Sequence, residues 1–191
     1  AGMTEVAVNE IALKKALGPR VVPLDLPGLL RRAAEISDET ARPLWRRLLA
    51  AAGTCAVPEP HGLESMKVYL AIKELVDQFR LDALAVGCYP HLMGKVCMAA
   101  SLLADQGVPL ACEGDVNGAV AQLLLTWLTN APTHNTDWLE SVDGETIILT
   151  HCGSGSFTLA EDPAHIRLDS VRLMGQGVCA LFPARPGPVT L

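Results

Sequence analysis

The chain has 191 residues, half of them apolar and 19% charged, which suits one medium domain, or one domain and the start of another, around a buried core. Its formal charge is −6 and its basic residues are scattered apart from two arginine pairs, so the sequence offers no positive surface for nucleic acid. No apolar run reaches the roughly 20 residues that cross a bilayer, and we expect no membrane partner.

The cysteines indicate a reducing compartment. They are widely spaced, form no CxxC pair and mostly lie in apolar surroundings, which predicts buried thiols instead of a disulfide framework. The N-terminal residues show no charged leader followed by an apolar stretch. We therefore expect a cytoplasmic protein. The six cysteines are Cys55, Cys88, Cys97, Cys112, Cys152 and Cys179.

Both ends of the sequence resemble interior segments of a longer chain. Residues 1–3 look like a loop that enters a helix, and residues 188–191 stop within an apparent strand. The expectation is a central-to-C-terminal fragment of a larger protein.

The first 80 residues are predicted to be mainly helical. Apolar residues recur at helical spacing, Gly18 followed by proline ends the first helix, and Ser37 or Asp38 caps the third. The predicted elements are helices over 5–17, 26–35, 38–52 and 64–79, a strand at 21–22 and a loop over 53–63.

Residues 84–128 predict alternating strands and helices. Two short apolar runs, at 84–88 and 109–112, have strand length, and helices are predicted over 94–105 and 115–128. Strands that are apolar on both faces and alternate with helices are typical of a parallel sheet covered by helices. The predicted fold class is therefore α/β, with a Rossmann-like parallel sheet flanked by helices.

The pattern changes near residue 145. Short strand candidates separated by glycine and proline follow, and no helix of useful length fits. This predicts an α/β domain over 1–145 and the beginning of a β-rich C-terminal domain over 146–191. The strand candidates lie at 146–150, 156–159, 166–173, 178–182 and 189–191.

Ligands of parallel α/β sheets gather at the carboxyl ends of the strands. Here that rule selects the loops 88–92 and 112–118. Glu113 and Asp115 follow directly on a buried strand. For Asp115 we favour helix capping, whereas Glu113 is equally open to a ligand role and to complementing the positive end of the next helix.

Two polar clusters lie downstream. The loop 132–138 brings His134 and Asp137 close in sequence, and His151 stands beside Cys152 after an apolar strand. Surface turns are the alternative for both clusters. A Cys–His nucleophile is disfavoured because adjacent strand residues point to opposite faces. A zinc hydrolase is disfavoured because no HExxH motif occurs, and no phosphate-binding glycine loop is present.

These loops carry a family resemblance. The strings CEGDVNGA, NTDW and HCG, in this order, together with the earlier LDALAVGCYPHL and the closing GQGVCALFPARPGPVTL, resemble the L-fucose isomerase-like family. The likeness covers residues 64–191 well and 1–63 more loosely. CEGD followed by NGA is its most specific part.

The resemblance implies a metal-dependent ketol isomerase that prefers manganese and acts on L-fucose, D-arabinose or a related sugar. It implies Glu113 and Asp137 as the metal-binding and catalytic carboxylates. The family's third ligand, a histidine, is expected beyond Leu191. His151 is expected to line the pocket instead of replacing that histidine.

The implied chemistry suits these residue types. An aldose becomes a ketose when a proton moves between C2 and C1 through a cis-enediol, which a carboxylate can mediate. Mn²⁺, or another divalent cation, accepts oxygen and imidazole ligands and acts as a Lewis acid. Whether Glu113 or Asp137 is the base stays open. The candidates for binding the sugar are Asn117, His134, Trp138 and His151.

The sequence therefore predicts an aldose–ketose isomerase. The alternative is a non-catalytic sugar-binding or assembly domain, because the chain as given lacks the third metal ligand. The family resemblance further implies a homo-oligomer, a trimer or a hexamer, whereas the identity of the sugar is open.

Overall fold

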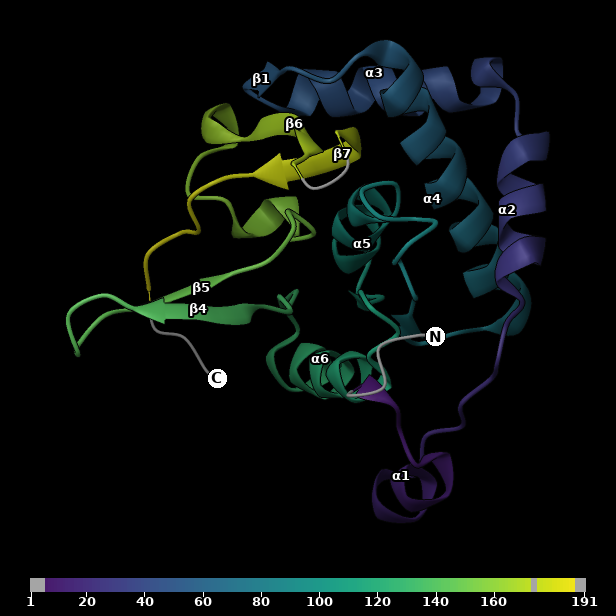
Figure 1. The fold of residues 1–191 in the computed structure, drawn as a ribbon, viewed down its shortest axis with the longest axis vertical. Coiled ribbons are helices and arrows are strands. Elements are labelled where there is room, and N and C mark those ends of the chain that lie inside the picture. Colours follow the sequence, from purple (N-terminus) through teal and green to yellow (C-terminus); the bar gives the residue numbers. More distant parts are fainter. Residues whose placement is uncertain (1–5, 173–174, 188–191) are drawn as a thin grey trace.

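The structure, a computed structural model, describes residues 6–172 and 175–187 (Figure 1). The predicted loop at 1–3 and the predicted strand at 189–191 lie outside these residues. The helices are α1 (Glu10–Leu17), α2 (Leu26–Glu35), α3 (Asp38–Ala51), α4 (Glu59–Phe79), α5 (Cys97–Ala104) and α6 (Val116–Thr129). The strands are β1 (Thr54–Cys55), β2 (Leu84–Ala85), β3 (Leu110–Ala111), β4 (Asp137–Ser141), β5 (Ile147–Thr150), β6 (Arg167–Val171) and β7 (Gln176–Leu181).

Side-chain caps fix where several helices begin. Asp25 accepts a hydrogen bond from the Gly28 amide at the start of α2, and Ser37 accepts one from the Thr40 amide at the start of α3. Such caps satisfy amides that have no partner within the helix. The prediction for α2 is confirmed at both ends, and that for α3 differs by one residue.

Other predicted elements need correction. No strand forms at 21–22, and residues 156–159 contain a 3₁₀ helix instead of a strand. The first helix begins at Glu10, after a non-helical stretch. The predicted loop 53–63 holds β1 and the first turn of α4, which begins at Glu59 because proline is tolerated in the first helical turn.

The two short strands of the α/β segment form a parallel pair. Leu84 is paired with Leu110, and Ala85 with Ala111. Helix α6 packs on one side of the pair and α5 on the other (Figure 1). Helix α4 packs on α5, and α2 packs on α4. This arrangement leaves the loops that follow β2 and β3 side by side. A larger Rossmann-like sheet stays a prediction.

A hydrophobic cluster fills the space between these layers. It joins α2, α4, α5 and the β2–β3 pair, and its most completely buried large side chains are Ile72, Leu92, Val96 and Leu103. Because the cluster reaches from the loop after β2 to the end of β3, packing holds both strand ends in place.

The chain after residue 146 packs on the helices that precede it. β6 pairs in parallel with β1 and antiparallel with β7. Leu168 and Val178 share a buried cluster with Trp45 of α3 and Met66 of α4. A domain boundary near 145 stays a prediction, and residues from both sides of that position share this buried cluster.

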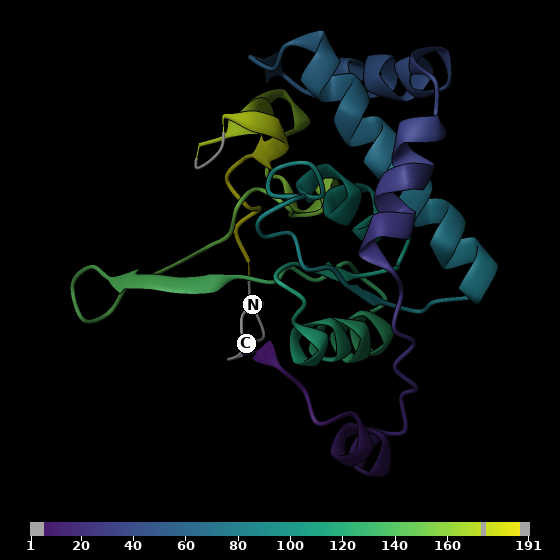
Figure 2. The same ribbon diagram turned by 45° about the vertical axis from the view of Figure 1, so that its right-hand side comes forward.

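The antiparallel strands β4 and β5 form a hairpin that projects from the rest of the molecule (Figure 2). Trp138 is 67% exposed and Leu139 63% exposed on it. Helix α6 also leaves large apolar side chains uncovered, with Leu128 82% exposed. Among the helices in the described ranges, none combines the length and the apolar character that spanning a membrane requires.

Candidate active site

Glu113 lies at a sharp reversal of the chain directly after β3. Its φ angle is +65° and that of Gly114 is +77°, so two consecutive residues occupy the left-handed region. The Gly114 amide donates a hydrogen bond to the Val86 carbonyl at 3.1 Å, which attaches the turn to the end of β2. This backbone places Glu113 beside the loop that follows β2.

The next acidic residue has a structural role. The Asp115 carboxylate accepts a hydrogen bond from the Gly118 amide at 2.8 Å and caps α6. The capping interpretation of Asp115 is therefore confirmed. Asn117 lies exposed in the first turn of the same helix, and its predicted contact with a sugar stays a prediction.

A cavity of about 270 Å³ adjoins Glu113. It brings together the loops after β2 and β3, the start of α5 and the segment after β5, and so unites Glu113 with His151. The Nδ1 atom of His151 is buried and has no hydrogen-bond partner among the described residues. The lining residues are Cys88, Tyr89, Met93, Gly94, Cys97, Cys112, Glu113, His151, Cys152 and Val171.

Asp137 lies near this cavity but is not among the described residues that line it. It opens β4 and pairs with Thr150, the residue before His151. Burial, the neighbouring thiols, and the charges of Glu113 and Asp137 raise the pKa of Cys152 to about 11. Both carboxylates are therefore near enough to Cys152 for their charges to act on its thiol.

His134 is a close neighbour of His151. Its ring packs on the backbone at Gly155, where an added Cβ would lie 3.3 Å from the His134 Cε1 atom. More than a third of His134 is exposed, yet desolvation of its packed ring, with a smaller contribution from His151, lowers its pKa to about 4. His134 is therefore a neutral ring near pH 7.

Trp138 is placed differently from its neighbour Asp137. Successive side chains of a strand point to opposite faces, so the two residues of β4 do not face the same surface. The exposed ring of Trp138 lies on the projecting hairpin. Its predicted stacking on a sugar stays a prediction.

The cysteines were predicted to be buried thiols, and their grouping around one cavity was not predicted. Cys88, Cys97, Cys112 and Cys152 all line the cavity. A hydrogen bond from the Cys112 thiol lowers the pKa of Cys88 to about 6, and the same contact raises the pKa of Cys112. The sequence did contain a signal for this grouping, because Cys88 and Cys112 are the first residues of the loops 88–92 and 112–118, which follow neighbouring strands.

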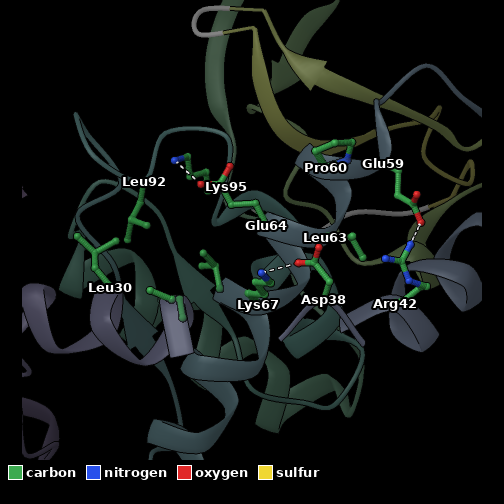
Figure 3. Close-up of a pocket in the computed structure, with 13 residues that line it drawn as sticks. Leu30, Asp38, Arg42, Glu59, Pro60, Leu63, Glu64, Lys67, Leu92 and Lys95 are labelled. Atoms are coloured by element: carbon green, nitrogen blue, oxygen red, sulfur yellow. Dashed lines mark hydrogen bonds and ion pairs between the residues drawn. The ribbon is translucent and has the colours of Figure 1, made fainter. Parts of the chain in front are cut away.

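A larger cavity, of about 420 Å³, lies elsewhere, between α2, α3, α4 and the loop at 92–95 (Figure 3). Its three basic side chains are all engaged in ion pairs, and none of the predicted site residues lines it. The smaller cavity at Glu113 is therefore the candidate site. The ion pairs are Arg42–Glu59, Lys67–Asp38 at 2.6 Å and Lys95–Glu64 at 2.7 Å.

The kinds of ligand atom around Glu113 suit a divalent cation, but the described residues provide too few of them. A carboxylate and an unpartnered imidazole nitrogen share the cavity, and Mn²⁺ accepts both kinds of ligand. Within residues 6–172 and 175–187, no three histidine, cysteine or acidic side chains lie close enough to hold an ion together. A resident metal would need a ligand from outside these residues.

Comparisons with known proteins point to sugar isomerases. No family model matches the chain. A protein named sulfoquinovose isomerase from Priestia aryabhattai is 24% identical over 164 residues, which cover 81% of this chain and 36% of the relative. Its namesake from Alkalicoccus urumqiensis is 24% identical over 156 residues, 78% of this chain and 35% of the relative.

A third relative has higher identity over a shorter region. The sulfoquinovose isomerase of Clostridium sp. (strain MSTE9) is 32% identical over 100 residues, which cover 50% of this chain and 22% of that protein. The chain thus spans about a third or less of the length of these relatives. The matches relate it distantly to sugar isomerases, whereas membership of the L-fucose isomerase-like family stays a prediction.

Proposed function

We propose that this chain contributes part of the active site of an aldose–ketose isomerase. The observation that carries the proposal is the shared cavity of Glu113 and the unpartnered His151, in a chain related to proteins named sulfoquinovose isomerase. A carboxylate and a histidine whose Nδ1 atom has no partner among the described residues thus line one cavity. These are the groups that a proton transfer on a sugar requires.

The reaction moves two protons. A base takes the proton from C2 of the open-chain aldose, which leaves a cis-enediol, and returns a proton to C1. A hydroxyl proton moves from O2 to O1, so that C2 becomes the ketone. Glu113 and Asp137 are the candidates for the carbon-bound proton, and their division of roles stays open. Glu113 is the stronger candidate for direct contact because it lines the cavity.

His151 is proposed to bind a sugar hydroxyl. Its Nδ1 atom is buried without a partner in the described chain, and a buried polar atom left unpaired costs about 1–3 kcal/mol. A hydroxyl in the cavity would remove that cost. Asn117, His134 and Trp138 remain secondary proposals for contacts with the sugar.

Metal dependence is part of the proposal. Glu113 and Asp137 would hold Mn²⁺ or another divalent cation together with a further ligand. When bound, the cation would act as a Lewis acid toward the charge that develops on the sugar oxygens.

We propose sulfoquinovose as the first candidate substrate because the relatives are named for it. L-fucose and D-arabinose are the next candidates. Sulfoquinovose bears a sulfonate, which needs cationic or N–H partners. The described residues that line the Glu113 cavity include no lysine or arginine, and their one histidine, His151, is assigned above to a sugar hydroxyl. A sulfonate would therefore extend away from this part of the site.

A non-catalytic sugar-binding or assembly domain is the second candidate. The incomplete ligand set among the described residues favours it. We also propose a homo-oligomer, a trimer or a hexamer. A second copy would cover the exposed apolar side chains of α6 and of the β4–β5 hairpin, which are Leu124, Trp127, Leu128, Trp138, Leu139 and Val142.

The first test is turnover of a sugar panel by the full-length protein with and without Mn²⁺. The panel contains sulfoquinovose, L-fucose and D-arabinose. Glu113→Gln is expected to lower kcat by about 100-fold or more, because proton transfer by a positioned side chain contributes at least that much. Glu140→Gln, which changes an exposed carboxylate on β4, is the matched control and should retain turnover.

Two results would contradict the proposal. One is full activity of Glu113→Gln on a sugar that the unaltered protein converts. The other is binding of a panel sugar without conversion of any of them, which would support the non-catalytic alternative.

A further inference from the structure

Four of the six cysteines line the Glu113 cavity. Cys88 follows β2, Cys97 opens α5 and Cys112 follows β3. The Cys112 thiol is the main influence on the pKa values of both Cys88 and Cys97, which it lowers. All of these cysteines are free. The reaction proposed above uses none of them.

The backbone brings the segments that carry Cys88 and Cys112 together. An added Cβ on Gly114 would lie 3.9 Å from the Gly87 Cα atom, so the two chains pass closely just beyond the parallel pair. Cys88 and Cys112 flank this point of approach, one on each chain. A disulfide needs Cβ atoms about 3.5–4.5 Å apart, so it requires two backbone segments that pass each other closely, as these do.

We propose that Cys88 and Cys112 are an oxidant-sensitive thiol pair, which a peroxide converts to a disulfide in the cavity wall beside Glu113. Cys88 is the first to react because it is 9% exposed, whereas Cys112 is 4% exposed and Cys97 is 3% exposed.

The step balances. The Cys88 sulfur attacks one peroxide oxygen, the O–O bond breaks, and Cys88 becomes a sulfenic acid with release of one water. The Cys112 sulfur then attacks the Cys88 sulfur, the S–O bond breaks, and a second water leaves with the Cys112 proton. Two thiols are oxidised by two electrons, and one peroxide is reduced to two waters.

A disulfide here would tie the turn that carries Glu113 to the loop after β2. We expect it to lower turnover by the isomerase, and this consequence rests on the proposed function. The oxidation itself does not, because mass spectrometry detects it without a sugar substrate. The two ideas can therefore fail separately.

The experiment treats the full-length protein with hydrogen peroxide, blocks the remaining thiols with an alkylating agent and digests the chain after Lys, Arg, Asp and Glu. This digestion separates the thiols, because peptides 83–95, 96–105, 106–113 and 146–161 each carry one cavity cysteine, respectively Cys88, Cys97, Cys112 and Cys152. The expected result is a cross-link between peptides 83–95 and 106–113, with the loss of two hydrogen atoms and recovery by dithiothreitol.

Matched variants sharpen the test. Cys88→Ser and Cys112→Ser should each abolish this cross-link, whereas Cys55→Ser, at an exposed cysteine of β1, should retain it. Three results would overturn the proposal: no cross-link in the unaltered protein, a cross-link from Cys112 to Cys97 instead, or addition of oxygen to Cys88 without a cross-link.

Discussion

Glu113 is the residue on which the candidate site depends, and its backbone is unusual. A φ angle of +65° in a residue other than glycine costs about 1–2 kcal/mol. Such strain persists where surrounding contacts hold it, and it is found often at functional sites. Here the conformation reverses the chain at the end of β3 and leaves the side chain in the cavity wall.

His134 makes the stability of the folded chain depend on pH. Its pKa is about 4 in the folded state, against an ordinary value of 6.5. Between these values the unfolded chain binds more protons at this residue, so the free energy of unfolding should fall as the pH falls from 6.5 toward 4. His134→Gln should reduce this acid-dependent loss in urea titrations at pH 7, 6 and 5. An unchanged pH dependence would contradict the account, and His165→Gln, at an exposed histidine, is the control.

At the scale of elements, α6 begins at Val116, shortly after Glu113, and Asp115 caps it. Gly118 of its first turn is so close to the cap that an added Cβ would lie 2.4 Å from an oxygen of Asp115. The position of the turn at Glu113 therefore depends on where α6 begins.

Asp115→Ala should lower the free energy of unfolding by about 1 kcal/mol because the first-turn amide of α6 loses its acceptor. Asp115→Asn should keep most of the stability, since asparagine caps helices equally well. Chemical denaturation of the two variants checks this. If Asp115→Asn lost turnover as completely as Glu113→Gln, capping alone would not describe this residue.

Local signals predicted these helices well. Asp25, Ser37 and Asp115 mark the starts of α2, α3 and α6, because a cap acts within a few residues along the chain. The pairing of β1 with β6 joins residues more than 100 positions apart, and nothing near Thr54 indicates it. Register between distant segments depends on tertiary packing, which one sequence does not display.

The candidate site likewise combines residues that local signals predicted with residues that only tertiary packing brings together. The rule about strand ends selected the loop with Glu113, and the polar pattern after β5 selected His151; both line one cavity. The sequence did not indicate that Cys97, on a helix, would meet Cys112 there. Nor did it indicate that Asp137 would lie in a projecting hairpin, since hairpin direction depends on how the flanking chain packs.

At the scale of the molecule, the segment after residue 146 is joined tightly to the helices. The Val178 amide donates a hydrogen bond to the Gly94 carbonyl at 3.1 Å. An added Cβ on Gly177 would lie 2.1 Å from that carbonyl oxygen, so glycine is needed for this close approach. Gly94 also lines the Glu113 cavity. The C-terminal strands therefore help to build its wall.

The measurement that tests the central claim most directly is solvent exchange at the sugar carbon, followed by NMR in D₂O with the full-length protein and a sugar that it converts. If the Glu113 carboxylate moves the proton between C2 and C1, the unaltered protein should place deuterium on C1 of the ketose. Glu113→Gln should lose both conversion and deuterium incorporation while the sugar still binds. Incorporation by Glu113→Gln at the rate of the unaltered protein would contradict the account.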